Sequence, residues 1–390
     1  MKNILKVSIK KKDHFTLKKN HIMNNKNIIS NSKNKIINSK NKITYNKNLF
    51  IYKNNIEKTN KKNKIEEVIQ QFNFNKHRII VEDSYIESKT QNTFIIFNSV
   101  YDILTLVYIN NNNNIVTFNL VDFKKINEIK NNNPERKIIH LRHYQCKKSN
   151  KDLILTIINY NLIEIFDITN LERLLTLKNI YENGKIYSSC FIEEKNNIYV
   201  LTSNESVFNA EGIKVFDFKG NMIKSIKNSF FSTYFIDFYF DEKSSTNFII
   251  TGNSKFIRSY NYDKNIFYRK YYEYNILEHY NAVIFEKNDI VKMMEIDTDG
   301  IIRIWNFHSG NLIKKIETEE QLSGIYLWDK EFLFIGMNDK NVEIFEINEE
   351  KLIYCFLSNF CILKMEKIEH PNLGKCLLAQ SKDKILLYNN

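Results

Sequence analysis

A chain of 390 residues, of which 43% are hydrophobic and 13% aromatic, is long enough to bury one large core or two ordinary ones. The net charge of +12 is uneven, because residues 1–64 carry +16 and the remaining residues therefore sum to −4. The five cysteines lack CxxC spacing, which argues against a disulfide framework. The N-terminal residues lack the apolar segment of a secretory signal peptide, which argues against secretion. These features favour an intracellular protein, the cytoplasm first, with a nuclear or organellar location left open.

The first 64 residues form a low-complexity segment of Lys and Asn with scattered Ile. Without regular apolar spacing such a segment cannot offset the entropy of ordering, so we expect a basic tail without a core. Its short apolar patch Leu49–Tyr52 could still pair as a strand. Three roles stay open for the tail: a solvated extension, contact with RNA, DNA or another polyanion, and an organellar presequence.

Residues 65–76 differ from the tail. Ile65, Val68, Ile69 and Phe72 recur at helical spacing, with Glu66 and Gln70 on the other side. The pattern predicts a short amphipathic helix that links the tail to the folded domain and packs against it.

From Arg78 onward the chain reads as nearly continuous β-structure, in runs of four to eight apolar residues separated by Asn, Asp, Lys and Gly. An aromatic residue followed by a polar one recurs at steps of 40 to 50 residues, a period typical of four-stranded propeller blades. Several turns depend on asparagine; we interpret the run Asn110–Asn114 as a solvated turn. The aromatic–polar pairs are Phe118-Asn119, Phe166-Asp167, Phe216-Asp217, Tyr260-Asn261, Trp305-Asn306, Phe345-Glu346 and Tyr388-Asn389.

If each pair ends the third strand of a blade, residues 77–390 hold six complete blades and a seventh with three strands, 362–367, 375–379 and 385–389. The missing strand must come from elsewhere, and Arg78–Val81 precedes the first blade without another partner. We therefore predict an all-β, seven-bladed propeller of four-stranded antiparallel blades, closed by this N-terminal strand. Leu49–Tyr52 is the weaker alternative for closure.

The fifth and sixth blades resemble the WD-repeat family of β-propellers. His279 opens the fifth blade, followed by Asp299-Gly300 and Ile302-Arg303-Ile304-Trp305; the sixth has Asp339 in the corresponding turn and Phe345 in place of tryptophan. The resemblance implies a buried hydrogen-bonded set to which His279, Asp299 and Trp305 contribute, with Met294 and Glu295 where a hydroxyl is expected. It also implies a non-catalytic scaffold that presents its faces to protein or peptide partners.

No motif for catalysis or phosphate binding is present, so we expect no cofactor, no metal and no enzyme activity. His140, His143 and Cys146 lie on one strand at a spacing that points them to opposite faces. Asp297 and Asp299 are better explained by a hairpin turn than by catalysis. Cys355 and Cys361 are expected to be core thiols. An active site around the central channel would need acids or histidines aligned on the innermost strands, and none is evident.

One further run could bind a partner. Tyr268, Arg269, Tyr271 and Tyr272 belong to an interleaved basic and aromatic stretch, Phe267–Tyr274. Such a stretch can stack bases or dock peptides, and it equally describes a charged outer strand that resists aggregation. The leading hypothesis is a propeller subunit of a larger assembly; the alternative is a ribonucleoprotein or chromatin subunit whose basic tail binds nucleic acid.

Overall fold

We describe the protein from a computed structural model. It describes residues 70, 72, 74, 76–86, 92–146, 149–182, 184–194, 197–204, 212–226, 233–253, 255–273, 279, 282–296, 300–317, 322–348 and 351–389. The chain divides into two units, residues 1–64 and residues 65–390. All of the described residues belong to the second unit.

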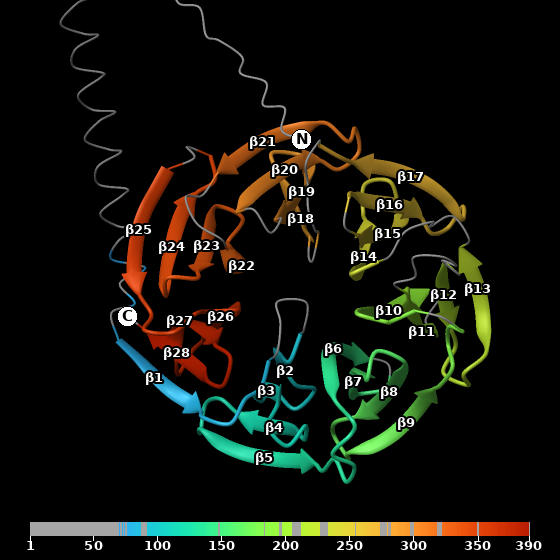
Figure 1. Ribbon diagram of the computed structural model, residues 1–390, viewed down its shortest axis with the longest axis horizontal. Helices are drawn as coiled ribbons and strands as arrows, with labels where there is room; N and C mark the ends of the chain where they lie inside the picture. The colour runs from blue at the N-terminus through green and yellow to red at the C-terminus, as the bar shows by residue number, and fades with distance from the viewer. Residues whose placement is uncertain are drawn as a thin grey trace, which may run out of the picture. The chain divides into compact units, whose positions relative to one another are not determined.

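Seven antiparallel sheets of four strands each are arranged as the blades of a β-propeller (Figure 1). Within blades 1 to 6 the strands follow chain order from the axis outward, and we call them a, b, c and d. The strands are β1 (Lys76–Val81), β2 (Phe94–Asn98), β3 (Leu104–Ile109), β4 (Ile115–Asn119), β5 (Lys124–Ile129), β6 (Ile138–Cys146), β7 (Lys151–Ile158), β8 (Leu162–Asp167), β9 (Glu172–Leu177), β10 (Ser189–Glu194), β11 (Asn197–Thr202), β12 (Ile213–Phe216), β13 (Met222–Ile226), β14 (Phe235–Asp241), β15 (Thr246–Gly252), β16 (Ile257–Asn261), β17 (Ile266–Tyr271), β18 (Ala282–Lys287), β19 (Ile290–Ile296), β20 (Ile301–Asn306), β21 (Leu312–Glu317), β22 (Leu322–Trp328), β23 (Phe332–Met337), β24 (Asn341–Glu346), β25 (Lys351–Leu357), β26 (Lys364–His370), β27 (Gly374–Gln380) and β28 (Ile385–Asn389).

This arrangement confirms the predicted all-β propeller with seven blades. The aromatic–polar pairs lie on the c strands, and the expected strand bounds differ from the observed ones by a few residues. The largest difference is in β26, which begins at Lys364 and ends at His370 rather than spanning 362–367.

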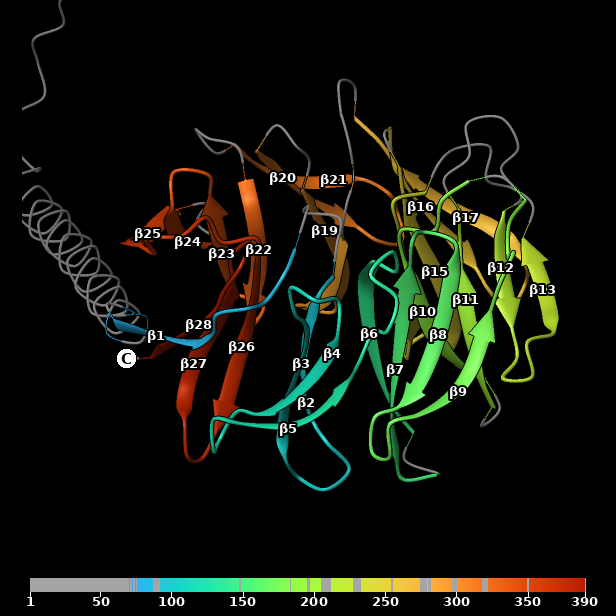
Figure 2. The ribbon, with the colours of Figure 1, turned by 60° about the horizontal axis from the view of Figure 1, so that its bottom comes forward.

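The ring is closed as predicted by its N-terminal strand. β1 pairs antiparallel with β28, from Lys76 opposite Asn389 to Val81 opposite Ile385, and so supplies the outer strand of blade 7. The two strands lie side by side in Figures 1 and 2. The alternative closing segment, Leu49–Tyr52, lies outside the described residues.

Two phenylalanines that precede β1 are part of the core. Phe72 and Phe74 are fully buried; the Phe72 ring meets the rings of Trp328 and Phe334 edge-on, with centroids 5.3 and 5.1 Å apart. Most of the predicted helix over residues 65–76 lies outside the described residues, and Phe72 itself lies in a turn. The aromatic cluster nevertheless fixes this end of the chain to blade 6.

The blades pack face to face, which explains why b and c strands are apolar on both faces. The strand β3 is buried at every position, and so is β23. Successive side chains of a strand point to opposite faces of the sheet, so most positions of a strand between two neighbouring blades are apolar on both faces.

The outer d strands carry a repeated irregularity. In blades 1 to 6 the pairing register of the c and d strands shifts beside the aromatic residue of the c strand, as between Ile304 and Trp305 or Ile344 and Phe345. A bulge at this position twists the exposed edge and interrupts the row of backbone groups that another strand would pair with.

Turns use asparagine and aspartate where glycine would be usual. Most non-glycine residues with positive φ are Asn or Asp, among them Asn113, Asn159 and Asn265, with φ between 50° and 58°. Their short polar side chains tolerate this left-handed conformation better than other side chains do. A chain with nine glycines can therefore still close its many hairpins.

Candidate functional site

The aromatic blade-signature residues predicted from the sequence lie in the core, and the aspartates that accompany them hold turns. Phe166, Phe216 and Phe345 are at most 9% exposed and pack into the clusters between blades. Their polar partners organise turns: Asp167 Oδ1 accepts the backbone N–H of Thr169 at 3.0 Å, and Asp217 Oδ1 accepts that of Lys219 at 2.9 Å. The exposed Asp339 accepts the backbone N–H of Asn341 at 2.9 Å.

In blade 5 a carboxylate stands where the resemblance leads one to expect a hydroxyl. Glu295 is fully buried, and its Oε1 accepts the indole N–H of Trp305 at 2.8 Å. Its Oε2 lies 2.6 Å from Nδ1 of the buried His279, a short contact whose alignment is poor for a hydrogen bond. Asp299 lies outside the described residues. Glu295 thus joins His279 and Trp305, a role that the sequence analysis did not give it.

Residues 267–271 of the basic and aromatic stretch lie on β17, the outer strand of blade 4, Tyr272 follows this strand, and only part of the stretch reaches the surface. Tyr271 is fully buried, and its hydroxyl donates to Phe307 O at 2.6 Å; a partner cannot reach it, which corrects the expectation for this residue. Tyr268 is half-buried, 3.1 Å from His308 Nδ1. Arg269 and Tyr272 are exposed, and the Arg269 Nε–H donates to His308 O at 2.7 Å. Arg269 and Tyr272 therefore remain candidates for binding a partner at the surface.

The innermost strands bring together charged side chains that the sequence analysis failed to align. Tracing the strand pairing inward from the residue that precedes each c-strand aromatic residue places seven residues at equivalent positions of the innermost strands around the axis. They are Ile95, Arg142, Cys190, Asp237, Val283, Tyr326 and Glu366. An Nη2 atom of Arg142 lies 2.8 Å from Asp237 Oδ2, so this ion pair joins blade 2 to blade 4. Asp237 raises the pKa of the Arg142 guanidinium.

A second layer lies near the start of the a strands. Lys364 of blade 7 donates to Asn92 Oδ1 and, at 2.6 Å, to Phe94 O, and so bridges to blade 1. Burial lowers the pKa of Lys364 to about 8; Arg142 adds to this, and Glu366 opposes it. Burial also raises the pKa of Glu366 and, with Arg142 and Lys364, lowers that of His140 well below its usual range. Lys364 and Glu366 belong to blade 7, whereas His140 and Arg142 belong to blade 2. The cluster therefore forms only in the closed ring and cannot be recognised within one repeat.

The lowered pKa of Lys364 predicts a pH dependence of stability. Above pH 8 the folded protein releases this proton, whereas the unfolded chain keeps it until about pH 10.4, so stability rises with pH. Between pH 7 and 9.5 the free energy of unfolding should increase by about 2 kcal/mol more in the natural protein than in a Lys364→Met variant. Urea unfolding at both pH values measures this difference. Equal pH dependence in the two proteins would contradict the assignment.

The histidines and cysteines do not gather into a site. His140 Nε2 lies 3.3 Å from Ser189 O, whereas His143 stacks on Phe97 and lies 2.9 Å from Asp152 Oδ1. Within the part of the chain that the structure describes, no group of three or more His, Cys, Asp or Glu side chains could hold a metal ion. Asp297, like Asp299, lies outside that part.

Cys355 is exposed and Cys361 half-buried, so the expectation of two core thiols was wrong for Cys355. Cys355 lies on β25, an outer strand, where alternate side chains point to solvent. The apolar run around it resembles a core strand in sequence, because the outer strands of this ring also carry exposed apolar residues such as Leu352 and Leu357.

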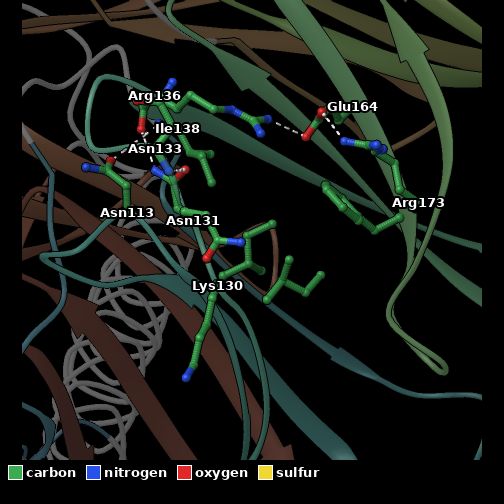
Figure 3. Close-up of a pocket in the computed structure, with 12 residues that line it drawn as sticks. Asn113, Lys130, Asn131, Asn133, Arg136, Ile138, Glu164 and Arg173 are labelled. Atoms are coloured by element: carbon green, nitrogen blue, oxygen red, sulfur yellow. Dashed lines mark hydrogen bonds and ion pairs between the residues drawn. The ribbon is translucent and has the colours of Figure 1, made fainter.

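A cleft of about 290 Å³ opens between blades 1 and 2 (Figure 3). Its apolar part comes from Ile115 and Ile129 of blade 1 and from Ile138 and Phe166 of blade 2. Its polar part comes from Asn113 in the turn between β3 and β4, from the connection between the two blades, and from β8 and β9. This volume lies at the lower limit of small-molecule sites, which occupy about 300–1,000 Å³, and suits one or two side chains of a partner.

The charged part of the cleft centres on Glu164. This carboxylate is buried, and two arginines reach it from opposite sides (Figure 3): Arg136 Nη2 lies 2.6 Å from Oε2, and Arg173 Nη1 lies 3.1 Å from Oε1. Lys130 also lines the cleft, and its side chain points away from Glu164 in Figure 3. Three cations and one carboxylate leave the cleft with an excess of positive charge.

The asparagines around the cleft hold its rim in place. The buried Asn114 accepts the backbone N–H of Asn131 through Oδ1 at 2.8 Å, and Asn131 Nδ2 donates to Arg136 O at 2.8 Å. The neighbouring Asn110, also buried, accepts the backbone N–H groups of Asn112 and Asn114 at 3.0 Å each. The asparagine run is therefore more than the solvated turn that we inferred from the sequence. A rim fixed by its own hydrogen bonds loses little entropy on binding.

Comparison with known proteins gives a likeness of architecture. No protein-family model matches the chain, and no curated protein matches it. A solved chain from "Crystal Structure of Mitotic Checkpoint Complex" superposes with a TM-score of 0.59 at 10% identity, covering 80% of this chain and 91% of that one. The likeness is one of fold. Of the helices among the described residues, none is long and apolar enough to cross a membrane.

Proposed function

We propose that this protein is a non-catalytic interaction scaffold of the WD-repeat type, a propeller subunit of a larger assembly, acting in the cytoplasm. The observation that carries the proposal is the cleft between blades 1 and 2, whose rim is fixed by hydrogen bonds and whose floor is apolar. A site of this kind, built on packed strands, holds its shape without a ligand. The similar solved chain belongs to a multi-protein complex by its printed title, which supports an assembly role for this chain.

Affinity purification tests the proposal. The full-length protein, residues 65–390 alone, and a full-length Ile129→Lys variant are purified from native extract, with and without nuclease, and bound proteins are identified by mass spectrometry. We expect the same protein partners with the first two proteins, after nuclease treatment as well, and their loss with Ile129→Lys. Capture of the same partners by the Ile129→Lys variant would contradict the proposal.

A second candidate function rests on the charge distribution. Because residues 1–64 carry +16 and the remainder −4, a polyanion would meet the tail rather than the ring. Lysines release counterions from a phosphate backbone, so nucleic-acid binding by the tail should weaken steeply with salt and vanish on its removal. Retention on nucleic acid that survives removal of residues 1–64 would exclude this function for the tail.

A further inference from the structure

We propose that the cleft between blades 1 and 2 binds an acidic peptide segment, whose carboxylate meets Arg136 and Arg173 while an apolar side chain enters above Ile129. This inference rests on the proposed scaffold function and names the chemistry of the partner. Three features of the cleft indicate the class of ligand: its charge, its free donors and its floor.

The charge of the cleft is opposite to that of the ring around it. Lys130, Arg136 and Arg173 outnumber Glu164 by two, whereas residues 65–390 together carry −4. The cleft therefore carries a local net charge of opposite sign to the net charge of residues 65–390. Such a patch steers and orients an anionic partner.

The arginines keep hydrogen-bond donors for a ligand. A guanidinium has five N–H donors, and the ion pairs with Glu164 engage one nitrogen of each arginine. The side chains of Arg136 and Arg173 are 31% and 55% exposed, so both arginines are accessible to a ligand. Guanidinium N–H groups form strong charge-assisted hydrogen bonds with carboxylates, so the nitrogens that Glu164 does not engage can bind a ligand carboxylate beside it.

The floor adds an apolar requirement. Ile129 is half-buried and lines the cleft together with Ile115 and Phe166, which are 2% and 6% exposed. A ligand with charged groups alone would leave this apolar surface exposed to water. A short segment with one acidic and one apolar side chain matches both the volume and the composition of the cleft.

The experiment selects phage-displayed random heptapeptides on the full-length protein, with prior depletion on a Lys130→Gln/Arg173→Gln variant. Both proteins carry the same basic tail, so peptides that bind the tail are removed and the survivors report the cleft. Arg136 still pairs with Glu164 in the variant, which avoids a buried unpaired carboxylate. We expect surviving peptides to combine acidic and apolar residues. Fluorescence anisotropy of the most enriched peptide should give a Kd roughly tenfold higher for the variant.

Two controls make the result specific. A Lys219→Gln/Lys264→Gln variant loses two exposed cations on other blades and should bind the peptide as the natural protein does. A Glu164→Gln variant should bind more tightly and with a steeper salt dependence, because it leaves both arginines without their internal carboxylate. A purely structural ion-pair cluster would instead give weaker or unchanged binding in Glu164→Gln. Circular dichroism and thermal unfolding confirm that each variant is folded.

Three outcomes overturn the inference: survivors without acidic residues, equal Kd values for natural and Lys130→Gln/Arg173→Gln proteins, or full binding by a peptide whose acids are replaced by their amides. The scaffold proposal is tested separately. If acidic peptides fail while Ile129→Lys still abolishes partner capture, the cleft remains the docking site and only the chemistry assigned to its ligand is wrong.

Discussion

Removal of residues 1–83 is expected to leave the protein in the insoluble fraction. The truncation deletes β1, which exposes the edge of β28, and it deletes Phe72 and Phe74 from the aromatic cluster around Trp328. Loss of one buried phenylalanine typically costs about 3–5 kcal/mol, and total stability of a domain is about 5–15 kcal/mol. Loss of two, together with a whole strand, exceeds what the ring can tolerate.

The control is removal of residues 1–64, which leaves β1 and both phenylalanines in place. This shorter truncation should give a soluble protein whose thermal unfolding differs little from that of the full chain. Sedimentation after expression and calorimetry measure the two results. Normal folding after removal of residues 1–83 would show that blade 7 does not need its fourth strand.

The second large effect concerns Glu295. A Glu295→Ala variant should lose about 3–5 kcal/mol of unfolding free energy, because Trp305 Nε1 and His279 then lie buried without their carboxylate and a cavity remains. A Glu295→Gln variant keeps an amide oxygen for the indole N–H and should lose about 1–2 kcal/mol. Urea unfolding compares both with the natural protein.

A matched control is available on the same hairpin. Lys292→Ala alters β19 at a half-buried position outside the His279–Glu295–Trp305 contacts and should change stability by less than about 1 kcal/mol. Equal losses for Lys292→Ala and Glu295→Ala would mean that Glu295 contributes no more than an ordinary strand position.

The ring could be predicted from the sequence because its causes are local and repeated. An aromatic residue such as Trp305 or Phe345 stands at or next to the end of each c strand, and this position is buried in blades 2 to 7 and half-buried in blade 1, where it is Phe118. The missing fourth strand of blade 7 then required β1, and the pairing with β28 confirms it. Period and strand length carry this information without any long-range contact.

The candidate cleft and the axial charges could not be predicted in the same way. Arg142 and Asp237 are 95 positions apart and meet only because the ring turns blade 2 toward blade 4. Arg136 reaches Glu164 from a connection between blades, where the sequence shows polar residues and one proline without a periodic pattern. Glu295 was noticed in the sequence but interpreted as a departure from a motif. No local pattern reveals that its carboxylate can contact both Trp305 Nε1 and His279 Nδ1.

The closing strand also sets an order of events during synthesis. Val81 of β1 pairs with Ile385, so about 300 residues must be translated before β1 meets its partner. At about 5–20 residues per second, this strand waits on the order of 15–60 s with an unpaired edge while six blades emerge and form. Until β28 has been translated, β1 has no partner strand, so residues 385–389 decide whether the seven blades become one closed ring.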